Sequence, residues 1–143
     1  MTKVGKVSSL FYSPPSGRTR VDTFDLDCKG IVDDKHYNKN IDRTVLIASL
    51  ESYELANHHN IDLAYGFLGE NVLIDYNPYH LTAGSRLKIG KVTFEISQLC
   101  TLCKSLTKID NKLPTLLKDD RGIFAKVMES GSINEGDEIY LLD

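Results

Sequence analysis

The chain has 143 residues, of which 41% are hydrophobic and 26% charged, and its formal net charge at pH 7 is −3. These values are ordinary for a globular protein, and the length predicts a single domain over residues 1–143 with its own core. The negative charge offers nucleic acid no global attraction, and no stretch approaches the ~20 apolar residues of a membrane span. We therefore expect a protein that binds neither nucleic acid nor membrane.

The cysteine content indicates a reducing compartment. There are three cysteines, an odd number, and the N-terminal residues lack the uninterrupted apolar run of a signal peptide. Such chains usually keep free thiols rather than a disulfide framework. The sequence therefore predicts a cytoplasmic protein.

The first third of the chain predicts three strands. Residues 4–11 form the first, which ends at the breaker cluster of residues 13–17, and residues 18–26 alternate polar and apolar as a single half-buried strand does. Residues 30–37 are expected to form a short polar loop. Residues 43–48 are β-branched and apolar, which suits a buried strand.

A helix is expected after that buried strand. Ser49 is a suitable N-cap for a helix ending near Asn57, and Glu51 is favourable in its first turn. A single longer helix beginning at Thr44 is the alternative, because periodicity alone does not exclude it.

The remainder of the chain is dominated by short strands. Residues 66–71 predict a glycine-bracketed turn, residues 101–120 an irregular segment, and Pro114 the start of a short helix. Further strands are predicted at residues 72–76, 87–89, 91–97, 122–128 and 138–142. Seven or eight strands with one good helix favour a mainly β protein, a β-barrel with a few helices packed outside it.

The cysteine pair after residues 91–97 is the first candidate site. The spacing of Cys100 and Cys103 is that of thioredoxin-like redox sites, but those sites open a helix in a βαβ unit, which is not predicted here. A structural zinc site would need Cys28 and His36 as further ligands, and no second paired motif supports that set. Cys28 and Cys100 are expected to be buried packing residues. Cys103 differs, because the neighbouring Lys104 can favour its thiolate.

Three other segments carry candidate residues. Asp34 and His36 lie in a cluster of ionisable groups that can bind a metal, orient a ligand or form a solvated turn. Asn71 can either stabilise its turn or face a site. Arg121 offers a fork of donors to an anion.

Together these segments resemble the MOSC domain, the module named for the C-terminal part of molybdenum-cofactor sulfurases. Residues 30–36 are similar to its glycine-rich acidic motif, residues 66–71 to its glycine-glutamate-asparagine turn, and Cys103 falls where the family keeps its cysteine. The segment from Leu81 to Gly90 and the segment from Arg121 to Ile139 fit its later strands in family order. Two positions depart from the family pattern: Asp33 replaces a usual glycine, and a leucine replaces the proline that often precedes the cysteine.

The resemblance implies a barrel-like domain that handles sulfur or a pterin-bound molybdenum. The first hypothesis is a stand-alone protein that binds molybdenum cofactor, with Cys103 as thiolate ligand, and reduces small N-hydroxylated compounds with electrons from a donor protein. Candidate cofactor-binding residues are Asp34, His36, Arg43, Asn71, Lys104 and Arg121. The second is a sulfur carrier, in which Cys103 receives persulfide sulfur from a separate pyridoxal-phosphate-dependent cysteine desulfurase. The third is a degenerate, non-catalytic ligand-binding domain, which Asp33 would favour.

Overall fold

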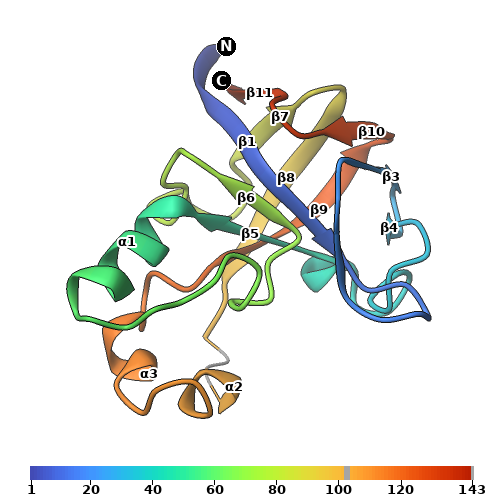
Figure 1. Cartoon of the computed structure of the whole chain (residues 1–143). Coiled ribbons are helices and arrows are strands. Elements are labelled where there is room, and N and C mark those ends of the chain that lie inside the picture. Colours follow the sequence, from blue (N-terminus) through green and yellow to red (C-terminus); the bar gives the residue numbers. More distant parts are fainter. Residues whose placement is uncertain (102–103, 143) are drawn as a thin grey trace.

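The computed structural model describes residues 1–101 and 104–142 (Figure 1). The strands are β1 (Thr2–Tyr12), β2 (Thr19–Val21), β3 (Thr23–Asp27), β4 (Gly30–Ile31), β5 (Val45–Ser49), β6 (Val72–Ile74), β7 (Arg86–Ile89), β8 (Val92–Leu99), β9 (Ile123–Glu129), β10 (Gly131–Asn134) and β11 (Glu138–Leu142). The helices are the 3-10 turn η1 (Ile41–Arg43), α1 (Leu50–His58), α2 (Lys104–Thr107) and α3 (Leu113–Leu116).

A closed barrel is the centre of the fold. The large sheet has the order β11-β7-β8-β9-β5-β6-β1-β2, and β11 also pairs with β1, which closes the ring. β5 and β6 are parallel and are connected through α1, whereas the other described barrel pairs are antiparallel. A small sheet of order β10-β3-β4 lies beside it. The predicted mainly β barrel with a few peripheral helices is therefore confirmed.

Two apolar cores explain why the β5 and β6 sequences do not alternate. Ile47 and Val72 pack in the barrel interior, while Ala48 and Leu73 face a second core formed with the helices. All five β5 residues are buried as a result. Figure 1 shows α1, α2 and α3 gathered at one side and end of the barrel, away from the chain termini.

Most predicted elements are present, with three corrections. The predicted loop of residues 30–37 begins instead with the buried strand β4 (Gly30–Ile31), which pairs with β3. Ser49 caps α1 as predicted, its side chain accepting a hydrogen bond from the Glu51 amide at 3.1 Å, and the alternative helix from Thr44 is wrong because Val45–Ser49 is strand β5. The prediction of one strand over residues 18–26 is also wrong. The chain bends at Asp22, so β2 pairs with β1 in the barrel and β3 pairs with β10 and β4 in the small sheet. In the part of the chain that the structure describes, no helix has the length and apolarity needed to cross a membrane.

Candidate functional site

A pocket lies at the end of the barrel where β1 and β8 finish and β9 begins. Its volume is about 520 Å³, which is within the usual range for small-molecule sites. Ser13 follows β1, Cys100 follows β8, and Arg121 precedes β9, and all three line the cavity. We call it the barrel-end pocket.

Basic side chains dominate the lining of this pocket. They come from segments far apart in the sequence, namely Arg18, Lys35, His36, Lys39, Arg43 and Arg121. Among the described lining residues, Asp34 supplies the acidic side chain. The pocket is therefore strongly cationic in a chain whose formal net charge is −3, and it suits an anionic ligand.

The Asp34 carboxylate is occupied by backbone donors. It is buried, its Oδ1 accepts a hydrogen bond from the Ser13 amide at 2.7 Å, and its Oδ2 accepts one from the His36 amide at 2.9 Å. These bonds hold the loop against the end of β1. The same loop places the exposed His36 at the pocket lining.

Asp33 adopts the backbone conformation that glycine favours. Its φ is +70°, in the left-handed region, which Asp tolerates better than most residues with a Cβ. The left-handed backbone conformation expected of a glycine is therefore adopted here by aspartate.

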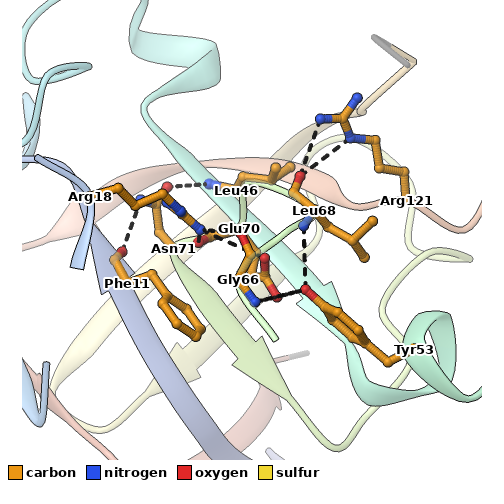
Figure 2. Close-up of polar contacts among 9 residues, drawn as sticks. All are labelled: Phe11, Arg18, Leu46, Tyr53, Gly66, Leu68, Glu70, Asn71 and Arg121. Atoms are coloured by element: carbon orange, nitrogen blue, oxygen red, sulfur yellow. Dashed lines mark hydrogen bonds and ion pairs between the residues drawn. The ribbon is translucent and has the colours of Figure 1, made fainter. Parts of the chain in front are cut away.

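Asn71 joins strands that would otherwise separate at this end of the barrel. Its Oδ1 accepts from the Leu46 amide at 3.0 Å, and its Nδ2 donates to the Phe11 carbonyl at 3.1 Å (Figure 2). Its backbone also bonds to both residues. Asn71 lines the barrel-end pocket while tying β5 to β1.

The turn formed by residues 66–70 holds two arginines by its carbonyl groups (Figure 2). Arg18 Nη2 donates to the Gly66 carbonyl at 2.9 Å and to the Glu70 carbonyl at 2.5 Å. Arg121 is buried, and its Nη2 donates to the Leu68 carbonyl at 3.2 Å. Both guanidinium groups are thus fixed at the pocket wall by one short segment.

The Glu70 carboxyl group is buried and bonds both to this turn and to helix α1. Glu70 is fully buried; its Oε2 accepts from the Tyr53 hydroxyl and from the Gly66 amide at 3.3 Å, and its Oε1 lies 3.7 Å from Arg18 Nη2. Burial raises the pKa of the Glu70 carboxyl, and the Tyr53 hydrogen bond and the Arg18 charge oppose that rise. Burial also raises the pKa of Tyr53, with a further contribution from the Glu70 charge.

Arg43, which also lines the pocket, is held by a ring and an amide. Its guanidinium carbon lies 5.7 Å from the centroid of the Phe124 ring. The Gln98 amide, with its oxygen turned toward Arg43, accepts from Nε at 2.9 Å and from Nη2 at 3.0 Å. An arginine oriented in this way can present its remaining donors to an anion.

The cysteines do not share one environment. Cys100 is buried, as predicted, and lines the barrel-end pocket, whereas Cys28 is exposed in the turn between β3 and β4. The prediction that Cys28 is buried is therefore wrong, because the short hairpin turn leaves its side chain in solvent. Cys103 and the side chain of Lys104 lie outside the described residues. Within the described residues, no three His, Cys, Asp or Glu side chains are grouped so as to hold a metal ion.

Five of the six candidate cofactor-binding residues come together at the barrel-end pocket. These are Asp34, His36, Arg43, Asn71 and Arg121. Arg18 also lines this pocket but was not predicted as a site residue, because residues 18–26 were predicted to form a strand. Its position directly after the breaker cluster was the available signal, since loops that follow strands often carry functional side chains.

Comparisons with known proteins agree with this architecture. The YuaD protein from Bacillus subtilis superposes with a TM-score of 0.76 at 21% identity, covering 95% of this chain and 94% of that one. YiiM from Escherichia coli gives a TM-score of 0.72 at 19% identity, covering 96% and 70% respectively. YiiM from Geobacillus stearothermophilus gives 0.71 at 15% identity, covering 99% and 75%. At these identities the likeness shows the fold alone.

A search of curated protein sequences found no significant match. The family model described as the MOSC domain matches residues 33–140, which is most of the chain. This chain belongs to the MOSC domain family.

Proposed function

We propose that this protein binds molybdenum cofactor in the barrel-end pocket, with Cys103 as thiolate ligand, and reduces a small N-hydroxylated compound. The observation that carries the proposal is the gathering of six basic side chains around one pocket of about 520 Å³ in a member of the MOSC family. The cofactor bears a phosphate and a polar pterin, and guanidinium groups bind such anions through paired hydrogen bonds.

The residues present fit this group chemically. Arg121, Arg18 and Arg43 would bind the phosphate and the pterin oxygens, because the described contacts already fix their guanidinium groups at the wall. Cys103 is three residues from Cys100, which lines the pocket, and a soft thiolate suits molybdenum. When bound, the cofactor supplies a two-electron redox centre.

The reaction also needs protons and a source of electrons. Conversion of an N–OH group to N–H consumes two electrons and two protons and releases water. His36 is exposed among the pocket-lining residues, so its imidazole can donate a proton there. The electrons would come from a donor protein.

The decisive test is the metal and pterin content of protein made in a host that synthesises the cofactor. We expect near-stoichiometric molybdenum and pterin in the wild type and a loss of most molybdenum in Cys103→Ser. Arg43→Gln should lower cofactor content several-fold. Arg86→Gln is the matched control, because Arg86 is an exposed β7 arginine paired with Glu95 on the barrel wall.

Two results would refute the proposal. One is wild-type protein without molybdenum, and the other is equal molybdenum in Cys103→Ser. If metal-free protein instead gains one sulfur atom on Cys103 after incubation with a cysteine desulfurase and cysteine, as seen by mass spectrometry, the sulfur-carrier function replaces it.

A further inference from the structure

A second cavity adjoins the barrel-end pocket and has a different character. Its volume is about 530 Å³, and its lining includes Phe11, Arg18, Arg20, Tyr65, Phe67 and Arg121. We call it the aromatic groove. It shares Arg18, Gly69 and Arg121 with the barrel-end pocket, so the two cavities adjoin at the turn of residues 66–70.

Two aromatic side chains of the groove are unusually open to solvent. Phe67 is 58% exposed and Tyr65 is 50% exposed, although large aromatic side chains usually bury most of their area. The Tyr65 ring stands edge-on to Tyr53, with the ring centroids 5.0 Å apart. Tyr53 is itself hydrogen-bonded to Glu70 and to the Gly66 amide. Tyr65 is therefore held in place by buried contacts while much of its ring remains available.

The groove also has a fixed positive charge. The Arg18 guanidinium carbon lies 5.3 Å from the centroid of the Phe11 ring, and the Gly66 and Glu70 carbonyls hold its Nη2. Arg121 is held by the Leu68 carbonyl on the far side of the same turn (Figure 2). Among the described residues that line the groove, none is acidic. Arg20 also lines the groove, and its Nε lies 3.0 Å from Oε1 of Glu135.

These features define one ligand chemistry. Exposed rings stack on or edge against a flat ring, and oriented guanidinium groups bind an anionic substituent at the end of that ring. We propose that the aromatic groove binds a planar aromatic anion, with its ring against Phe67 and Tyr65 and its anionic group on Arg18. Binding at this site does not require the cofactor. Its assignment as the substrate site rests on the proposed function, because the shared Arg18 would place the ligand beside the cofactor.

The test is a calorimetric titration of cofactor-free protein with 2-naphthoate. Two matched ligands separate the contributions: 2-naphthylmethanol keeps the ring without the charge, and cyclohexanecarboxylate keeps the charge without the aromatic ring. We expect each to bind at least about tenfold more weakly than naphthoate, a difference of about 1.4 kcal/mol.

Variants locate the ligand in the groove. Phe67→Ala should weaken naphthoate binding about fivefold or more. Because the Phe67 side chain is exposed, this substitution should not unfold the protein. Met128→Ala is the matched control, since Met128 is an exposed apolar residue of β9 outside the groove. Arg18→Gln should weaken naphthoate and leave 2-naphthylmethanol unchanged, which a folding defect would not do.

Several outcomes would overturn the inference. These are no naphthoate binding, equal affinity for the neutral ligand, or unchanged affinity in Phe67→Ala, which would put the ligand in the barrel-end pocket. Preferential binding of an acidic peptide would make the groove a protein-docking surface instead. Naphthoate binding by a protein that takes up no molybdenum would refute the proposed function and leave this inference standing. Molybdenum uptake without naphthoate binding would do the reverse.

Discussion

Asp33 adopts a backbone conformation that glycine would adopt without strain, and it does so at an energetic cost. Its φ of +70° is left-handed, and residues with a Cβ are strained there by about 1 kcal/mol, with Asp and Asn among the least penalised. Glycine takes this conformation freely, but it also loses more entropy on folding. The two effects have opposite signs, and relief of strain is the larger of them where φ is positive.

We therefore predict that Asp33→Gly raises the free energy of unfolding by up to about 1 kcal/mol and that Asp33→Val lowers it by more than about 1 kcal/mol. Urea denaturation followed by circular dichroism measures both. Lys35→Gly is the matched control: it lies in the same exposed loop with an ordinary φ, so glycine there should destabilise. Destabilisation by Asp33→Gly as large as that of Lys35→Gly would contradict the strain argument.

Glu70 gives the fold a pH dependence of unusual sign. Its folded-state pKa is raised by burial, so the unfolded chain releases this proton at lower pH than the folded protein does. Between the two pKa values the folded state binds more protons, and stability contributed by this group falls as the pH rises. Below the unfolded value near 4.3 the group has no effect, and above the folded value its penalty is complete.

We predict that Glu70→Gln gains stability relative to the wild type as the pH rises from 4.5 to 7. The Gln side chain can still accept the Tyr53 hydrogen bond without the buried charge. Urea denaturation at both pH values gives the difference, and each unit of pKa elevation corresponds to about 1.4 kcal/mol. Glu54→Gln removes a carboxylate from the exposed surface of α1 and is the control. A Glu70→Gln difference that is the same at both pH values would refute the prediction.

At the scale of elements, the turn of residues 66–70 depends on close backbone packing. A Cβ on Gly66 would lie 2.9 Å from Cε1 of the Phe11 ring, while a Cβ on Gly69 would meet only Arg121 Nη2 at 3.8 Å within 4 Å. Both glycines have positive φ. The Arg18 guanidinium lies over the Phe11 ring. A Cβ on Gly66 that displaces this ring would therefore also displace the guanidinium group.

We predict that Gly66→Ala lowers the free energy of unfolding by about 2–4 kcal/mol, the sum of left-handed strain and overpacking, and that Gly69→Ala costs only about 1 kcal/mol of strain. Gly84→Ala is a strain-only reference, because Gly84 has positive φ and open space around it. Thermal or urea unfolding provides the three values. Equal losses at the three positions would show that the Phe11 contact is unimportant.

Most secondary-structure elements and many pocket residues could be predicted from the sequence, and those that could not have physical reasons. The alternation of residues 18–26 indicates which side chains are buried but not to which sheet each residue belongs. The bend at Asp22, which separates β2 from β3, could therefore not be predicted from it. Arg18 reaches the site through carbonyl groups about 50 residues away along the chain, and no local pattern contains that contact. Arg121 was found because it lies within a recognisable motif at the start of a strand.

At the scale of the whole molecule, pairing of the first and last strands closes the barrel. Thr2 is paired with Leu141 and Lys6 with Glu138 in the register of β1 and β11. β11 also pairs with β7, and its Ile139 is fully buried in the barrel interior. Figure 1 shows the two termini side by side at the end of the barrel away from the helices. Since paired strands lie about 4.8 Å apart, a linker of a few residues would span the termini.

We predict that a circular permutant joined through a linker of about four glycine and serine residues folds when opened between Asn111 and Lys112, which are exposed between α2 and α3. The free energy of unfolding should fall by less than about 2 kcal/mol, because no strand pair is cut. A permutant with the same linker opened between Glu95 and Ile96, inside β8, is the control and should fail to fold, since β8 pairs with both β7 and β9. Circular dichroism and urea denaturation distinguish the outcomes. As a control, the linear chain carries the same linker as a tail. If this chain folds but the first permutant does not, joining the termini is incompatible with the β1–β11 pairing.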